Sequence, residues 1–152
     1  PSMRSLQFGG RAIELNNARI YNCAFMPIDN MHSFSEAMFL LLGGTGVGYS
    51  VQGHNIQKLP PILKPNYNRN KRYIVQDSII GWADAIKTLL KSYTGKLTSH
   101  VSFDLSDIRE KGATLITAGG KAPGPEPLRL CLVQIEAILR QERSLLISSA
   151  TT

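Results

Sequence analysis

Cysteine is scarce in this sequence of 152 residues, which contains only Cys23 and Cys131. The two cysteines lie far apart and form no C-x-x-C pair, so the sequence gives no support to a zinc ribbon or a thioredoxin-like motif. A structural disulfide is not expected in a chain without a secretion signal. The histidines His32, His54 and His100 have no metal-ligand spacing, so we expect no metal site.

Long hydrophobic runs are also absent. The longest, residues 37–42, is far too short to span a bilayer, so we expect a cytoplasmic protein with no membrane contact. The net charge is +6, which is compatible with nucleic acid, nucleotide phosphates or an acidic partner. The only short basic run is Arg69, Lys71 and Arg72, without a nucleic-acid motif or an aromatic stacking platform. A nucleic-acid partner is therefore not expected, and a basic single-stranded nucleic-acid binder is the least favoured class.

The composition and pattern favour one α/β domain. The hydrophobic fraction of 43% is ordinary for a globular fold, and the length suits a single core. Strands are expected at residues 18–26, 47–51, 73–75, 100–105 and 113–117, and helices at 33–42, from 77 or 78 to 94, and from 127 onward. Because strands alternate with helices, the pattern predicts a largely parallel sheet to which all later units add.

Two of these expectations concern local detail. Ser33 and Glu36 have capping-box spacing, and apolar residues fill every side of the helix that follows, so we expect that helix to be buried nearly all round. Residues 57–70 contain several prolines and asparagines and are expected to form a loop, as are residues 1–10 unless they form an edge segment.

Cys23 is the first candidate for chemistry. A cysteine in a strand is commonly a small buried hydrophobe. Its neighbours Tyr21 and Asn22 are polar, however, and a cleft-facing thiol could be a redox or nucleophilic group. The residues alone leave both interpretations open. Cys131 lies on the apolar stripe of the last helix and is expected to be a core residue.

Two glycine loops are the other candidates. Residues 43–48 follow a helix and precede a strand, the reverse of the order in dinucleotide folds and P-loops. No Lys-Ser/Thr pair ends this loop. It is therefore either a tight turn or a place where Gly46 and Gly48 let a ligand approach the backbone closely. Residues 119–126 form a long glycine-proline loop, which is either functional or a plain connection.

Several ordered motifs resemble a known family. Residues 3–10 (MRSLQFGG), 17–24 (NARIYNCA), 44–51 (GTGVGYSV) and 58–60 (KLP) resemble the catalytic chain of ribonucleotide reductases. Residues 103–109 (FDLSDIR), 111–113 (KGA) and 119–128 (GGKAPGPEPL) are similar to the adenosylcobalamin-dependent, monomeric ribonucleoside-triphosphate reductases (class II). The resemblance covers nearly the whole chain, from residue 1 to about residue 140.

The resemblance implies a fold and a substrate site. The family has a ten-stranded α/β barrel, and residues 1–152 would form a single fragment, about the first half of it, with mostly parallel strands and covering helices. Cys23 would be one of the redox pair, delivering reducing equivalents to the 2′-carbon of the ribonucleotide and ending in a disulfide with a second cysteine. The matching substrate-binding residues are Ser2, Asn22, Gly46, Val47 and Gly48.

The resemblance also implies an effector site. The loop that relays the identity of a bound deoxynucleoside triphosphate to the substrate pocket would be Gly119, Gly120, Lys121, Ala122, Pro123 and Gly124. Asp29 and residues 52–58 lie where further effector contacts are expected. Lys121 stands where the family has arginine, which keeps the charge and loses the bidentate geometry toward phosphate.

Some of the family's parts are missing. The sequence has no finger-loop cysteine for a thiyl radical, no glutamate motif beside it, no redox partner for Cys23 and no adenosylcobalamin-binding part. Since the chain starts at Pro1 and ends without a polar tail, we expect a piece of a larger reductase, inactive alone. It would depend on the remaining half, on adenosylcobalamin and on a thioredoxin-like reductant, with a ribonucleoside triphosphate as substrate.

Two alternatives remain. One is a stand-alone deoxynucleotide-sensing or interaction module without catalysis. The other is a metal-dependent reductase with a separate radical subunit, because Asn22-Cys23 and the first glycine loop belong to both types of reductase. The Gly-Pro-Glu-Pro-Leu stretch at residues 124–128 favours the adenosylcobalamin type.

Overall fold

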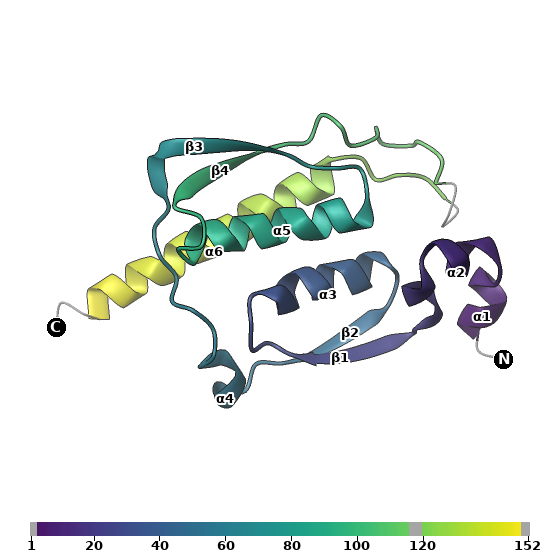
Figure 1. The fold of residues 1–152 in the computed structure, drawn as a ribbon, viewed down its shortest axis with the longest axis horizontal. Helices are drawn as coiled ribbons and strands as arrows, with labels where there is room; N and C mark the ends of the chain where they lie inside the picture. The colour runs from purple at the N-terminus through teal and green to yellow at the C-terminus, as the bar shows by residue number, and fades with distance from the viewer. Residues whose placement is uncertain (1–2, 116–119, 150–152) are drawn as a thin grey trace.

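The structure, a computed structural model, describes residues 3–115 and 120–149. In chain order its elements are α1 (Met3–Phe8), α2 (Arg11–Leu15), the 3-10 helix η1 (Asn17–Ile20), β1 (Cys23–Pro27), α3 (His32–Leu42), β2 (Gly46–Ser50), α4 (Gly53–Ile56), β3 (Asn66–Ile74), α5 (Ile79–Tyr93), β4 (Ser99–Asp104) and α6 (Glu126–Ser149) (Figure 1). Within these ranges, no helix is both long and apolar enough to cross a membrane.

The described strands form two separate parallel pairs, β1 with β2 and β3 with β4. A parallel pair needs a crossover, usually a helix, and α3 and α5 supply the two crossovers. The α/β class and the parallel pairing are therefore as predicted. The expectation of one continuous sheet is wrong, because residues 51–65 lead from one complete strand-helix-strand unit to the next. The two strand pairs of the described residues do not close into a barrel.

The two units meet through their helices. Figure 1 shows α3 and α5 lying between the two strand pairs, and the two helices pack against each other. The main core gathers on α5, where Ile86, Leu89, Leu90 and Tyr93 are buried as their spacing predicts. Helix α6 covers this core with Leu128, Leu132 and Leu139.

Local interactions set where the helices begin. The Ser78 hydroxyl accepts a hydrogen bond from the Gly81 N–H at 2.9 Å and caps α5, one of the two predicted caps. The capping box predicted for Ser33 is wrong. The side chain of Asn30 instead accepts from the N–H groups of His32 and Ser33 at 2.8 and 3.2 Å, so α3 starts one residue earlier.

Helix α3 is less buried than its composition suggests. Its buried residues are Ser33 and Ser35, while Leu41 is 55% exposed. The β1–β2 pair covers one side of the helix and α5 covers another, and the described residues provide nothing for its remaining apolar side. The expectation of burial all round therefore fails in this chain.

Several other segments also differ from the sequence pattern. Residues 66–72 form most of β3, although a loop was expected, because β4 supplies the pairing and the strand is exposed at every position except Tyr73. The strand expected at residues 18–26 begins only at Cys23, because residues 17–20 form η1. Residues 1–10, expected as a loop or an edge segment, contain helix α1, and α2 follows at Arg11. In the strand expected at residues 113–117, Thr114 makes one antiparallel bridge with Lys121. Residues 116–117 of that expected strand lie outside the described residues.

Cys131 packs against the core and is half-buried, in line with its predicted position. Burial raises the pKa of its thiol. A thiol with a raised pKa forms less of the reactive thiolate at neutral pH.

A polar network ties α6 to the β3–β4 unit. The Tyr93 hydroxyl donates to Glu136 Oε1 at 2.9 Å, and Arg140 donates to the same oxygen at 2.8 Å. His100 Nε2 lies 3.2 Å from it. Burial opposes ionisation of Glu136, but the hydrogen bonds from Tyr93 and Arg140 outweigh it and lower the pKa of Glu136. Burial makes the largest contribution to the raised pKa of Tyr93, and the hydrogen bond with the Tyr67 hydroxyl raises this pKa further.

We predict that Tyr93→Phe lowers the free energy of unfolding by roughly 0.5 to 1.5 kcal/mol, because Glu136 loses a donor while the ring stays in place. Urea denaturation of the chain measures this change. Tyr49 is 65% exposed, so Tyr49→Phe is the matched control and should change stability by less than about 0.5 kcal/mol. Equal stability of the two variants would show that the network does not contribute.

A second prediction concerns acid stability. The hydrogen bond from Arg72 on β3 lowers the pKa of Asp104 on β4 to about 2. Since the folded pKa lies below the unfolded value of about 3.9, this carboxylate stabilises the fold at higher pH, and the contribution is lost as the pH falls toward 2. Arg72→Gln should raise the pKa of Asp104, as followed by NMR titration of its carboxyl carbon. An unchanged titration curve would contradict the prediction.

Candidate functional site

Cys23 lies on the open face of the β1–β2 pair. In the parallel register Cys23 is opposite Gly46, and Phe25 is opposite Gly48. Cys23 and Phe25 are exposed, whereas Ala24 and Met26 between them are half-buried. Because side chains alternate along a strand, Cys23 and the two glycines share the face that α3 does not cover. The structure thus brings three of the predicted site residues together.

Hydrogen bonds from the start of β2 and from α1 hold Tyr21 and Asn22, the two residues before Cys23. The Gly46 N–H donates to the Asn22 carbonyl at 2.8 Å, and the buried Thr45 donates through its hydroxyl to the Tyr21 carbonyl at 3.1 Å. Arg4 on α1 donates to the Asn22 side-chain oxygen at 2.7 Å and also to the Gly44 carbonyl. Sequence reasoning missed Arg4, since nothing in the pattern links two positions 18 residues apart.

The chain itself does not require glycine at positions 46 and 48. Neither residue has a positive φ. An added Cβ would lie 3.6 Å from the Asn22 carbonyl oxygen at Gly46 and 3.6 Å from Phe25 Cδ2 at Gly48, both ordinary contacts. What glycine provides here is bare backbone on an open face, which allows a ligand to approach closely. Val47 is half-buried on the opposite face and could contribute only its backbone.

A cavity of about 760 Å³ lies between the N-terminal helices and the glycine-proline loop. Its walls come from α2, η1, the end of α3, the start of α5 and residues 122–124. Three of the predicted loop residues, Ala122, Pro123 and Gly124, line it. Asp77 and Arg109 form an ion pair at 2.5 Å in the wall. Sequence reasoning left these two residues out, because they lie 32 positions apart.

The loop is held in a defined shape. The Ala122 N–H donates to the Ala113 carbonyl at 2.7 Å, and the Gly112 N–H donates back to the Ala122 carbonyl at 2.9 Å. Gly124 has a φ of 80°, and an added Cβ would lie 3.1 Å from the Lys111 backbone nitrogen. Lys121 itself is exposed and does not line the cavity.

Arg19 is a further cavity residue that the pattern did not single out. It is only 7% exposed, and its Nε is buried without a hydrogen-bond partner among the described residues. Its guanidinium lies 5.5 Å from the centre of the Phe8 ring. An unpaired buried donor of this kind costs roughly 1 to 3 kcal/mol, and more for a charged group.

The remaining predicted residues lie elsewhere. Asp29 precedes α3 and lies 3.8 Å from the Lys58 ammonium, with its other oxygen accepting from Asn30 at 2.8 Å. It does not line the cavity, to which α3 contributes its opposite end through Phe39 and Leu42. Ser2 and Gly119 lie outside the described residues. The roles of these three residues stay predictions.

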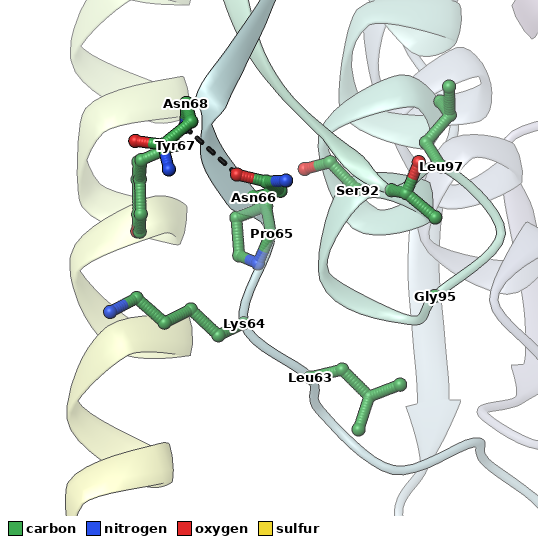
Figure 2. A pocket seen from close by; sticks show the side chains of 10 residues that line it. Leu63, Lys64, Pro65, Asn66, Tyr67, Asn68, Ser92, Gly95 and Leu97 are labelled. Atoms are coloured by element: carbon green, nitrogen blue, oxygen red, sulfur yellow. Dashed lines mark hydrogen bonds between the residues drawn. The ribbon is translucent and has the colours of Figure 1, made fainter.

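A second, shallower cavity of about 620 Å³ opens where β3 begins and α5 ends. Figure 2 shows Leu63, Lys64 and Tyr67 along one side of it, with Ser92 and Gly95 opposite. The dashed line marks the Asn68 N–H donating to the Asn66 side chain at 3.0 Å. None of the predicted site residues lines this cavity.

Comparison with known families identifies the class. A family model described as the insertion domain of B12-dependent ribonucleotide reductase matches residues 62–139, which is more than half of the 152 residues. The chain belongs to the family of B12-dependent ribonucleotide reductases. The matched stretch contains β3, α5, β4 and the first part of α6.

Two curated relatives show which kind of B12-dependent reductase the chain is similar to. The chain is 33% identical over 136 residues to an adenosylcobalamin-dependent ribonucleoside-triphosphate reductase of Euglena gracilis, covering 88% of this chain and 18% of the relative. It is 32% identical over 142 residues to a probable enzyme of the same description from Dictyostelium discoideum, covering 82% and 19%. The chain therefore spans about a fifth of the length of these curated relatives.

A solved structure supports the fold. The chain superposes with a TM-score of 0.80 on a crystal structure of a B12-dependent (class II) ribonucleotide reductase, with 24% sequence identity, covering 93% of this chain and 27% of that one. The paired units described above are thus the arrangement of a known reductase segment.

The geometry of the two glycine sites leads to a paired prediction. Gly48→Ala should leave the free energy of unfolding unchanged or raise it by about 0.5 to 1 kcal/mol, because a strand glycine is entropically costly. Gly124→Ala should lower it by roughly 1 to 2 kcal/mol, because alanine is strained at that φ. Urea denaturation of the two variants tests this. A destabilising Gly48→Ala would mean that the chain, and not a ligand, needs glycine there.

Proposed function

We propose that the protein carrying this chain is an adenosylcobalamin-dependent ribonucleoside-triphosphate reductase, and that Cys23 is one of its two reducing thiols. The observation that carries the proposal is the exposed Cys23 on an open sheet face beside two bare glycine backbones. The family membership and the adenosylcobalamin-dependent relatives support the reaction class.

The chemistry needs two thiols. Replacing the 2′-hydroxyl of a ribonucleotide by hydrogen consumes two electrons and two protons and releases water. Two thiols supply both when they join in a disulfide. The second thiol must come from outside this chain, because the only other cysteine is Cys131, which packs against the core. A disulfide formed in each cycle must then be reduced again, so we include a thioredoxin-like reductant among the partners.

The open face suits a nucleotide. The Gly46 and Gly48 backbone allows close approach of the sugar, and Val47 contributes its peptide between them. Asn22 uses its side-chain oxygen to accept from Arg4, which leaves its amide N–H groups as donors for the substrate. Ser2 is the remaining predicted contact. In this proposal Arg4 acts as a positioning residue for Asn22.

The second part of the proposal concerns regulation. The loop residues Gly120 to Gly124, with Gly119 before them, would sense a deoxynucleoside triphosphate effector. The support is that Ala122, Pro123 and Gly124 line a cavity together with Asp77 and Arg109. Lys121 and Asp29 are further proposed effector contacts, at the loop surface and before α3.

Adenosylcobalamin would supply the radical chemistry in the complete enzyme. We derive no step through this cofactor and propose that the part of the protein that binds it lies outside this chain.

A second candidate function is a deoxynucleotide-binding module that works without catalysis. The observation in its favour is that several elements of this chain, namely α2, η1, α3, α5 and the glycine-proline loop, line the larger cavity together, whereas the Cys23 face is open. Binding of deoxynucleoside triphosphates by the isolated chain, combined with turnover that does not depend on Cys23 in the full-length protein, would favour this candidate.

We predict that Cys23→Ser in the full-length protein abolishes multiple turnover and changes the Kd for nucleotides by less than about threefold. Serine keeps the side-chain size but cannot form the disulfide. Steady-state assays and equilibrium binding measure the two effects. Cys131→Ala is the control and should retain turnover. Loss of nucleotide binding in Cys23→Ser, or unaltered turnover, would refute the redox role.

A further inference from the structure

The open face of the β1–β2 pair carries a large apolar side chain beside Cys23. Phe25 is 73% exposed. Because side chains alternate along a strand, Phe25 lies on the same face as Cys23, about 7 Å further along β1. Its ring lies beside Gly48, where an added Cβ would be 3.6 Å from Phe25 Cδ2. Single exposed apolar residues are common on protein surfaces, and this one is informative because of what Cys23 requires from its surroundings.

Cys23 needs a second thiol close to it. In the proposed reaction two thiols join in a disulfide, and the only other cysteine of this chain, Cys131, packs against the core. The two Cα atoms of a disulfide are usually about 4.4 to 6.8 Å apart. The backbone that carries the second thiol must therefore come as close to Cys23 as Phe25 is. The chain spans only 18% and 19% of its two curated relatives, so most of such a protein is available to supply this backbone.

The surroundings of Cys23 change in polarity along the strand. Before it, Arg4 donates to the Asn22 side-chain oxygen at 2.7 Å, and the Asn22 amide suits a polar substrate. After it, on the same face, Phe25 offers only apolar surface, and Gly48 opposite Phe25 adds no side chain. A nucleotide and an apolar segment of polypeptide can therefore reach the thiol from opposite ends of the face without competing for the same surface.

We propose that Phe25 is the docking point for the segment, outside residues 1–152, that carries the second reducing thiol. The inference rests on the proposed redox role of Cys23 and adds the surface that brings the two thiols together. Burial of the Phe25 ring under this segment holds the second cysteine beside Cys23 and raises the effective concentration of one thiol at the other. The ribonucleotide is the oxidant: for each disulfide formed, one 2′-hydroxyl is replaced by hydrogen and one water is released.

Photocrosslinking of the full-length protein identifies the segment directly. The photoreactive residue p-benzoylphenylalanine replaces Phe25 in one variant and Tyr49 in the control. Tyr49 is 65% exposed, and it follows Gly48 in β2, so its side chain belongs to the opposite face of the pair. The reduced proteins are irradiated before adenosylcobalamin is added, and mass spectrometry maps the crosslinked peptides. In parallel, the wild-type holoenzyme performs one turnover of a ribonucleoside triphosphate without external reductant, and the cysteine joined to Cys23 is mapped.

Position 25 should crosslink within about five residues of the cysteine that is joined to Cys23, because a segment covering both positions needs to extend only about 7 Å beyond that cysteine. Position 49 should crosslink elsewhere. A crosslink from position 25 to a different segment, to a second copy of this chain or to no peptide at all would refute the docking surface.

Three substitutions in the full-length protein test the effect on the thiols. In glutathione buffers, Phe25→Ala should lower the equilibrium constant for disulfide formation at Cys23 about tenfold or more, because the docked segment loses the buried ring. Phe25→Leu keeps apolar surface and should lose less, and Tyr49→Ala should stay within about twofold of wild type. The Kd for ribonucleoside triphosphates should not change. A raised Kd with an unaltered disulfide equilibrium would make Phe25 a substrate contact and overturn the inference.

The outcomes separate this inference from the function it rests on. If wild type forms no disulfide at Cys23 after one turnover, the proposed redox role fails and the inference fails with it. If the disulfide forms, but position 25 crosslinks away from its partner or Phe25→Ala leaves the disulfide equilibrium unchanged, only the docking role of Phe25 is refuted.

Discussion

The packing of α3 against α5 is the interaction on which this structure depends. A parallel pair of strands cannot be closed by a short turn and needs a crossover that covers one face. Each strand pair in the chain uses one helix for this purpose, and the two helices then pack against each other. This contact places the β1–β2 pair, which carries Cys23, on one side of the two helices and the β3–β4 pair on the other (Figure 1).

The two candidate sites lie on either side of one short segment. Arg19 belongs to η1 and lines the cavity, and Cys23 follows four positions later at the start of β1. Between them the backbone is held by Thr45, by Gly46 and, through the Asn22 side chain, by Arg4. Arg4 and Arg19 also share the Phe8 ring, at 5.4 and 5.5 Å from its centre. A ligand in the cavity and a substrate on the open face would therefore contact neighbouring parts of one constrained segment.

Where the sequence pattern predicted well, the information was local. The stripe of α5, its Ser78 cap and the core position of Cys131 follow from side-chain spacing along one helix. The pattern failed where a partner distant in the chain decided the outcome. The start of α3 is a local exception, because Asn30, two residues before His32, caps the helix in place of Ser33. Strand β3 has no hydrophobic alternation and exists because β4 pairs with it. The cavity was missed for the same reason, since Arg19, Asp77 and Arg109 come from separate elements.

The sequence by itself determined the α/β class, the helices with regular apolar spacing, and the motifs that resemble the reductase family. These properties depend on residue types at fixed short intervals. Only the tertiary structure decided that the described strands form two pairs, that Cys23 shares an open face with Gly46 and Gly48, and that Arg19 is buried beside the start of α5, its Nε without a partner among the described residues. These features depend on contacts between positions far apart in the chain, and such contacts are set by packing and backbone pairing, for which a local pattern carries no signal.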